Sequence, residues 1–513
     1  MSVIVIGSGI NGLVAAATLA LQGRKVTVLE RLDRPGGAVR TEALTLPGFR
    51  HDVAAMNLSM FAGSAFHQAH ATELARHGLR FVAVDRPFAS AFPDGSHIGV
   101  STQLEETLAT LSLAQDQATW RTLLERFPAS ADALGALLSS PMQRGALLRT
   151  LWRIWRRQGT AGSLELLQLV LASPRQWVER HFHDPRLQAA LATWGLHLDF
   201  APDIAGGAIF PYLSSFGSQA MGMVLGHGGA DTVTNALVRT IEAHGGTVRC
   251  HAEVSQLHVH QGAVTGIALA SGENLAATTV LANLAPAGLL RLLEQGTGTP
   301  AYDDGLRQFR HAPGTLMIHV ALDALPPWRA TALRHFAYVH IGPSLDDLSR
   351  TYQQAMAGLL PDAPVLVVGQ PTVFDPSRAP AGQHILWIQV RCVPAQIRGD
   401  AAGTLLSTDW AEVKEAYADR VMAQLEAAAP GLARHVLARH VVSPLDLERE
   451  NPNLVGGDQI TGSHHLAQNF LFRPVRGYAD GHTPIAGLHL VGAAVWPGAG
   501  TGAVSGHLVA QRL

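Results

Sequence analysis

Three glycines near the start of the chain, Gly7, Gly9 and Gly12, follow a run of β-branched residues and precede an alanine-rich stretch. Between a strand and a helix, glycines at this spacing let the backbone approach a phosphate group, and the helix N-terminus favours negative charge. A second apolar run at residues 26–29 ends at Glu30, an acid placed to accept hydrogen bonds from ribose hydroxyls. This spacing predicts a dinucleotide site.

A second glycine pair, Gly36 and Gly37, follows Glu30 after one short loop. An extended FAD molecule needs a further close backbone approach at its pyrophosphate and ribityl chain, so the pair favours FAD over NAD. Glu30 would also repel the 2′-phosphate of NADP. We therefore predict that this region binds FAD. Residues within and beside the two turns contribute to the predicted site, namely Ile10, Asn11 and Arg31.

Length and composition restrict the class of protein. The chain has 513 residues, more than one typical domain, and its net charge of −2 gives no indication of nucleic-acid binding. Cys250 and Cys392 are the only cysteines, which excludes disulfide-reductase chemistry and cysteine-rich metal sites. Lys25 and Lys414 are the only lysines, which disfavours a Schiff-base mechanism. The histidine pairs lack carboxylates at ligand spacing, so we predict no metal site.

The sequence predicts at most peripheral contact with a membrane. No run of 18 uncharged apolar residues occurs, and the first strand begins at residue 2 or 3, so we expect a cytosolic protein without a signal peptide. Residues 142–158 predict a helix with leucine, isoleucine and tryptophan on one face. Its other face carries Arg149, Arg153, Arg156 and Arg157. Such a helix either docks at a membrane surface or packs on the protein core with its arginines in water, and the second interpretation is favoured.

The pattern of elements predicts a discontinuous chain organisation. Alternating strand and helix patterns give way after residue 60 to a long region of mixed helices, up to about residue 222. A helix at 231–245 and short strands at 247–282 indicate a return to the nucleotide domain. Residues 300–450 form a second excursion, and a strand at 488–492 with a helix near Ala503 returns once more.

We therefore predict an α/β fold with a Rossmann-type FAD-binding domain and an inserted α+β substrate-binding lobe. The predicted FAD-binding domain is discontinuous and comprises residues 1–70, 223–295 and 451–513. The predicted substrate, or cap, lobe comprises residues 71–222 and 296–450.

Four segments resemble the phytoene desaturase-like flavoproteins, a group that includes carotenoid desaturases and isomerases and retinol saturase. The four segments are residues 3–42, 48–53, 228–259 and 487–510. A fifth, NPNLVGGDQITG at 451–462 with FLFRP at 470–474, resembles the pyridine-nucleotide-disulfide-oxidoreductase-domain-like subgroup. The resemblance implies FAD as cofactor and a fold of the glutathione-reductase/amine-oxidase kind.

The resemblance also implies roles for residues far from the glycine turns. In such proteins the residue matching Val254 holds the adenine through its main chain, and the strand end at Gly492 and Ala493 approaches the pyrophosphate and ribityl chain. The N-terminus of the final helix points at the pyrimidine edge of the flavin, where its dipole stabilises an anionic reduced ring. The residues of that N-terminus are Gly502, Ala503 and Val504.

Bound FAD would carry the reaction, a hydride transfer between a substrate carbon and flavin N5, so the protein must position that carbon and manage one proton. Candidate acids and bases are His51 and Asp52 after the second glycine pair, for which a surface turn is an equal alternative. Further candidates precede the last predicted strand: Asp458, His464 and Arg473. For Asp458, capping of the turn after two glycines is at least as good an interpretation.

Three functions remain open from the sequence. The leading hypothesis is an FAD-dependent oxidoreductase that dehydrogenates or saturates an apolar, polyene- or lipid-like substrate. Because only one glycine motif with its acid is found, oxygen or a quinone is favoured over NAD(P)H as the electron acceptor. The alternatives are a flavin amine oxidase on the same fold and a flavin-free binding protein like the Rab GDP-dissociation inhibitors, against which the intact glycine set argues.

Overall fold

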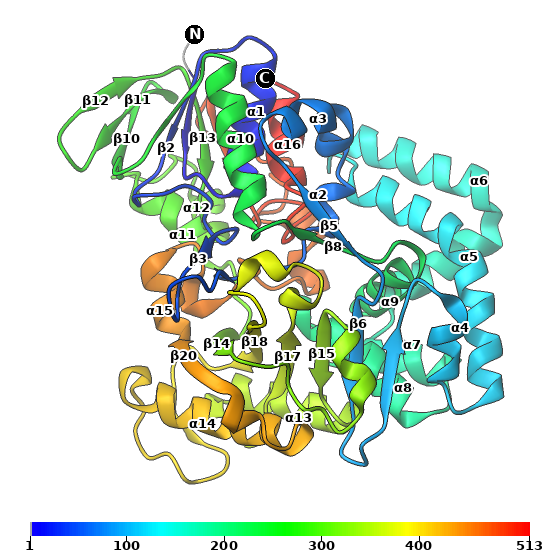
Figure 1. The fold of residues 1–513 in the computed structure, drawn as a ribbon. Helices are drawn as coiled ribbons and strands as arrows, with labels where there is room; N and C mark the ends of the chain where they lie inside the picture. Colours follow the sequence, from blue (N-terminus) through cyan, green and yellow to red (C-terminus); the bar gives the residue numbers. More distant parts are fainter. Residues whose placement is uncertain (1–2) are drawn as a thin grey trace.

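The computed structural model describes residues 3–513 and contains two large sheets (Figure 1). The first is a five-stranded sheet in the order β21–β13–β1–β2–β9, and all its neighbouring strands are parallel. Strands from the beginning, the middle and the end of the chain therefore lie side by side. They are β1 (Val3–Ile6), β2 (Val26–Leu29), β9 (Thr247–Arg249), β13 (Thr279–Asn283) and β21 (Leu488–Val491).

The inner strands of this sheet are rich in Val, Ile and Leu because both faces of the sheet are covered. β1 is buried at every position. One face packs against α1 (Ile10–Leu21), α10 (Asp231–Ala243) and α16 (Val504–Ala510). The other face packs against an antiparallel sheet and two short helices: β10 (Val254–His260), β11 (Ala263–Leu269), β12 (Asn274–Ala276), α11 (Pro286–Arg291) and α12 (Pro300–Arg307).

The second large sheet has seven strands in the order β20–β14–β18–β17–β15–β6–β7. Its pairs are antiparallel except β15 with β6, which are parallel. Helix α14 (Trp410–Ala428) covers one face, where Trp410 and Tyr417 pack against alternate residues of β18. The strands are β6 (Phe88–Ala91), β7 (His97–Val100), β14 (Gly314–Leu322), β15 (Tyr338–Ile341), β17 (Val365–Gly369), β18 (His384–Val393) and β20 (Val436–Val442).

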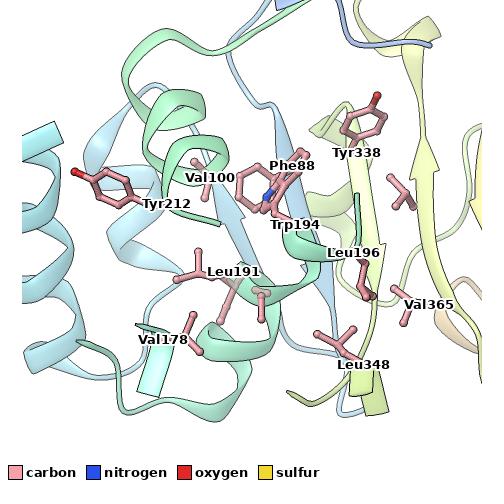
Figure 2. Packing of buried hydrophobic residues seen from close by; sticks show 14 of the residues in the cluster. Phe88, Val100, Val178, Leu191, Trp194, Leu196, Tyr212, Tyr338, Leu348 and Val365 are labelled. Carbon is pink, nitrogen blue, oxygen red and sulfur yellow. The ribbon is translucent and has the colours of Figure 1, made fainter. Parts of the chain in front are cut away.

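The opposite face of the seven-stranded sheet packs against a helical layer. Figure 2 shows Trp194, from the 3₁₀ helix η1 (Thr193–Leu198), beside Phe88 of β6 and near Tyr338 of β15. The rings of Phe88 and Trp194 meet edge to face with centroids 5.1 Å apart. The layer consists of α4 (Leu104–Ala109), α5 (Ala114–Leu138), α6 (Arg144–Leu171), α7 (Pro174–His181), α8 (Pro185–Ala192) and α9 (Ile209–Met221).

The remaining elements lie between and beside these layers. The helices among them are α2 (Ser59–Ala62), α3 (Ala65–Arg76), α13 (Leu345–Met356), α15 (Pro444–Glu450) and the 3₁₀ helices η2 (Thr331–His335), η3 (Pro371–Val373), η4 (Pro376–Arg378), η5 (Leu432–His435), η6 (Val455–Gly457), η7 (Leu466–Gln468) and η8 (Phe470–Phe472). The strands are β3 (Thr41–Glu42), β4 (His51–Asp52), β5 (Phe81–Val84), β8 (Met223–Gly226), β16 (Leu359–Leu360) and β19 (Gly399–Asp400).

The structure confirms the predicted strand–helix–strand unit at the N-terminus, the helix beginning at Asp231 and the final strand and helix. The expected helices between residues 60 and 222 are present, but the region also contains three strands that were not expected, β5, β6 and β7. The sequence of β6, FASA, has no β-branched residue. It is a strand because β15 and β7 pair with it on its two sides, and those contacts are invisible to local patterns.

Helix α6 contains the predicted amphipathic stretch, and it packs beside α5 at one side of the molecule (Figure 1). The favoured expectation that its apolar face packs on the core is wrong for most of that face. Only Thr150 and Ile154 of the helix are buried. Trp152 and Trp155 are 54% and 51% exposed. Two leucines of the same stripe, Leu148 and Leu151, are also exposed. In residues 3–513, no helix is both long and apolar enough to cross a bilayer.

Candidate active site

A cavity of about 980 Å³ begins at the carboxyl ends of the parallel strands and continues to the seven-stranded sheet. Glu30 and Val254 line one end of it, and Tyr338 and Trp387 line the other. The carboxyl edge of a parallel sheet is where α/β folds bind their ligands. The first end is called the nucleotide groove below, and the end beside Tyr338 and Trp387 is called the chamber.

Two glycine turns lie against each other along the nucleotide groove. Gly9 and Gly36 form a parallel bridge, and the Gly36 amide donates to the carbonyl oxygen of Ser8 at 3.1 Å. A Cβ on Gly37 would lie 3.1 Å from the Cα of Gly9, and one on Gly12 would lie 2.3 Å from the Gly7 carbonyl oxygen. Side chains at these positions would therefore separate the turns or close the groove.

Asn283, at the end of β13, lies between the first glycine turn and the last strand. A Cβ on Gly9 would lie 2.8 Å from its Nδ2, and a Cβ on Gly492 would lie 2.6 Å from its Oδ1. Asn453 holds it by donating to its carbonyl oxygen at 3.0 Å. The sequence reasoning missed Asn283, because its place depends on β13 inserting between β1 and β21.

Glu30 is fixed in the position that the motif predicts. Its Oε2 accepts hydrogen bonds from the amide and the hydroxyl of Ser8, at 3.0 and 2.5 Å, and its Oε1 accepts from the Leu32 amide at 3.0 Å. A carboxylate has about four acceptor positions, so one stays open at the groove that Glu30 lines. This open acceptor position fits a ribose hydroxyl, which would donate a hydrogen bond to it.

The predicted cofactor residues all line the cavity except Gly12, Gly36, Gly502 and Ala503. These four lie behind the lining. Gly502 is a contact position, where a Cβ would lie 3.1 Å from the Met60 carbonyl oxygen. Ala503 has φ +52° and immediately precedes α16. The N-termini of α1 and α16 pack directly on each other, since a Cβ on Gly506 would lie 2.0 Å from the backbone oxygen of Asn11.

The hypothesis that His51 and Asp52 reach the cavity is wrong, since neither lines it. Asp52 accepts hydrogen bonds from the Thr41 hydroxyl and the Ala230 amide, both at 2.7 Å, and forms an ion pair with buried Arg378. Arg378 also bonds Asp375 at 3.1 Å. Both oxygens of Asp52 are therefore used to join β4, the start of α10 and η4, which is a structural role.

Asp458 and Arg473 also lie outside the cavity lining and hold the loop between them. Asp458 accepts from the amides of Ile460 and Gly462, at 2.9 and 2.6 Å, which is the turn-capping alternative. Buried Arg473 donates to the carbonyl oxygens of Thr461, Gly462, Ser463 and Ala493. The arginine thus ties this loop to the end of β21.

His464 is the one predicted catalytic residue that lines the cavity. Its Nε2 accepts a hydrogen bond from the Ala499 amide at 3.0 Å, so the ring proton is on Nδ1. Burial holds the pKa of His464 well below its usual value, with Arg473 adding to the effect. The ring is therefore neutral, and it cannot accept a proton without losing the bond from Ala499.

The chamber is enclosed by apolar side chains from three directions. Phe127 comes from α5, Ile209 and Leu213 from α9, and Tyr338 and Trp387 from the sheet. The carboxylates that line the cavity belong to Glu30, Glu253 and Glu450, all of them at the nucleotide groove. Within residues 3–513, no group of three or more His, Cys, Asp or Glu residues could hold a metal ion.

Comparison with known proteins decides the class. The profile of the family described as "Flavin containing amine oxidoreductase" matches residues 10–513. The chain belongs to this family. It is an FAD-dependent oxidoreductase, and the groove formed by the two glycine turns and Glu30 fits the dinucleotide part of that cofactor. The flavin-free alternative is not supported.

Individual relatives place the chain near the desaturases. It is 28% identical to pyridine nucleotide-disulfide oxidoreductase domain-containing protein 2 of Rattus norvegicus, over 99% of this chain and 92% of the relative. It is 26% identical to a neurosporene-forming phytoene desaturase of Rhodobacter capsulatus, over 99% and 93%. The resemblance to the phytoene desaturase-like group is confirmed.

Solved structures show the same fold. An oxidoreductase from Methanosarcina mazei superposes with a TM-score of 0.63 at 17% identity and covers 100% of both chains. A putrescine oxidase variant superposes with a TM-score of 0.62 at 16% identity and covers 100% of this chain and 97% of its own. At these identities the likeness concerns the fold alone.

The histidine His51 makes stability depend on pH. It is fully buried, its Nε2 bonds the Thr45 hydroxyl at 2.8 Å, and its ring packs edge-on to His319. Burial, with His440 and Arg378 nearby, lowers its pKa from 6.5 to about 3. Below about pH 6.5 the unfolded chain takes up a proton on His51 and the folded chain does not. The contribution of His51 to the unfolding free energy is therefore fully present above that pH, and it decreases by about 1.4 kcal/mol for each pH unit below it.

We predict that His51→Gln lowers the slope of the unfolding free energy against pH between about pH 6 and 4. The expected decrease corresponds to one proton, or about 1.4 kcal/mol per pH unit. Urea unfolding at a series of pH values measures the slope. His260→Gln, at an exposed position of β10, is the matched control and should leave the slope as in the wild type. An unchanged slope in His51→Gln would contradict the prediction.

Proposed function

We propose that the protein transfers a hydride between FAD and a carbon of an apolar, polyene- or lipid-like substrate, by dehydrogenation or saturation. The observation that carries this proposal is the chamber, which is continuous with the nucleotide groove and enclosed by aromatic and aliphatic side chains. FAD, when bound, supplies the two-electron chemistry. The chain itself contributes a binding surface that excludes water and aligns the substrate.

The side chains of the chamber support an apolar substrate over an amine. An ammonium group is stabilised by a carboxylate or an aromatic cage. The ring centroids of Tyr338 and Trp387 are 5.7 Å apart, so the two rings could form part of an aromatic cage for an ammonium group. This favours amine oxidation as the second candidate. The lining carboxylates, however, are all at the nucleotide groove, and the chamber holds buried Arg391, whose positive charge would repel an amine.

The proton of the reaction has no base among the predicted residues. His464 uses its Nε2 lone pair on the Ala499 amide, and Asp52 and Asp458 do not line the cavity and are held by structural hydrogen bonds. We assign His464 to shaping the cavity, where it packs against Gly498 so closely that a Cβ there would lie 2.3 Å from Nε2. Water is the proton carrier in this proposal.

We further propose oxygen or a quinone as the electron acceptor. Doubly wound α/β folds bind a nicotinamide dinucleotide at the carboxyl edge of a parallel sheet. In the described part of the chain, the five-stranded sheet is the only fully parallel sheet with more than two strands, and its one groove is used for FAD.

We also propose that α6 rests on a membrane surface and that the protein is otherwise cytosolic. Leucine and tryptophan form an exposed stripe on the part of α6 before Gly159, and exposed arginines flank this stripe. The backbone leaves helical geometry at Gly159, and beyond it Leu164, Leu167 and Leu171 are also exposed. An apolar stripe with tryptophan and arginine suits the headgroup boundary of an anionic bilayer. A substrate dissolved in lipid would then have a short path to the chamber, because α5, which lines it, packs on α6.

The substrate class is tested by anaerobic reduction of the bound flavin. We predict that members of a panel of carotenoids, retinoids and apolar unsaturated lipids bleach the absorbance near 450 nm, whereas putrescine and cyclohexylamine do not. Bleaching by the amines alone would establish the second candidate and contradict the proposal.

Membrane contact is tested by co-sedimentation with liposomes that contain phosphatidylglycerol. We predict that Trp152→Ala/Trp155→Ala lowers the bound fraction at least fivefold, because two exposed indoles are removed from the interface. Leu406→Ala, at a residue that is 93% exposed and far from α6 in the sequence, is the control and should bind like the wild type. Equal sedimentation of all three proteins, or none, would refute the membrane contact.

A further inference from the structure

Arg391 is a buried arginine that has no hydrogen-bond acceptor and no ion-pair partner among residues 3–513. It is 6% exposed and lines the chamber from β18. Its Nε is closed off from solvent without a hydrogen-bond acceptor. In residues 3–513 neither terminal nitrogen of its guanidinium donates a hydrogen bond, and it forms no ion pair. An uncompensated buried charge is costly, so its retention calls for an explanation.

The other buried arginines show that this chain otherwise satisfies such groups. Arg378 pairs with Asp52 and Asp375, Arg473 donates to a ring of backbone carbonyls, and Arg40 pairs with Glu42 and Glu450. Arg391 therefore differs from the rest in having donors and no acceptor within the described residues.

The alternation of β18 directs Arg391 to the chamber. Leu386, Ile388 and Val390 pack on the α14 side of the sheet. The intervening residues lie on the opposite face, and these are Trp387, Gln389 and Arg391, all of which line the cavity.

The neighbours of Arg391 in the chamber also have unused donors. The indole Nε1 atoms of Trp194 and Trp387 have no acceptor, and neither has Nε2 of Gln459, whose Oε1 accepts from Gln389. All of these residues line the same cavity. His197 beside them is neutral, because burial and Arg391 hold its pKa well below the usual value. This end of the chamber therefore contains several buried donors that have no acceptor among the described residues.

The nearest carboxylates do not satisfy Arg391. Asp199 accepts from the Tyr352 hydroxyl at 2.8 Å and pairs with His465 at 3.2 Å, and Asp458 is bound by backbone amides. Both carboxylates line a separate small cavity behind Arg391 of about 10 Å³, which has room for at most one water. The two carboxylates act on the charge of Arg391 through space. They do not occupy the donors of the guanidinium that face the chamber.

We propose that Arg391 binds the carboxylate of the substrate, so that the substrate is an amphipathic acid with a long apolar chain. This inference rests on the proposed function and narrows its substrate class. A guanidinium offers two parallel donors that match the two oxygens of a carboxylate. With its acid group held at the sheet, the apolar chain of the substrate lies between α5 and α9 and extends toward the glycine turns.

The test uses the FAD-loaded protein and a fluorescent polyene acid, cis-parinaric acid, with its methyl ester as the uncharged control. We expect the acid to bind at least tenfold more tightly than the ester. Arg391→Gln should remove this difference, Arg391→Lys should restore part of it, and Arg307→Gln, at an exposed arginine paired with Asp304, should behave like the wild type.

A structural role for Arg391 would give a different result. If the guanidinium stabilises the fold, Arg391→Gln should melt at a lower temperature than the wild type. If its role is to bind the carboxylate of a ligand, the variant should melt at or above the wild-type temperature and keep its flavin spectrum. Equal binding of acid and ester by the wild type, binding of neither, or a lower melting temperature of Arg391→Gln would overturn the proposal. Binding is measured without turnover, so a failure of the proposed hydride transfer would leave the outcome readable.

Discussion

The close contact of backbone with backbone at the two glycine turns is the constraint on which the rest of the structure depends. Gly9 pairs with Gly36, Gly12 packs on Gly7, and Asn283 fills the space between the first turn and the last strand. A side chain at Gly12 or Gly36 would occupy space that backbone atoms now hold, and one at Gly9 would collide with the side-chain amide of Asn283. The result is a groove lined by backbone at the end of a parallel sheet, where a pyrophosphate can be bound by amides.

The groove gains its function from what lies beyond it. The seven-stranded sheet presents Tyr338 and Trp387 to the same cavity, and α5 and α9 cover it. Charge is distributed unevenly along this space: carboxylates line the nucleotide groove, and Arg391 lies at the sheet. Within residues 3–513 the other buried arginines are paired or hydrogen-bonded, as Arg378 is with Asp52 and Arg473 is with backbone carbonyls. Arg391 is neither, which is the basis for the ligand contact proposed above.

The sequence predicted the elements whose contacts are local in the chain, and it missed those that depend on residues far apart in the sequence. The first strand, turn and helix are local, so their residues sufficed, and Glu30 has the place that the motif predicts. The strand β6 and the position of Asn283 depend on pairing across hundreds of residues. His51 and Asp52 follow the second glycine pair in sequence but turn toward Arg378. A signal for Arg391 did exist, since Gln389 and Arg391 alternate with apolar residues along β18.

One chain is expected to bind one FAD in the groove that its glycines keep open. Titration of the deflavinated protein with FAD, followed by flavin fluorescence quenching, tests it most directly. We predict one FAD per chain for the wild type and for Gly135→Ala, whose Cβ would meet nothing within 4 Å. Gly9→Val should bind FAD at least a hundredfold more weakly. A wild-type protein that takes up no FAD, or a Gly9→Val variant that binds it equally well, would contradict the account.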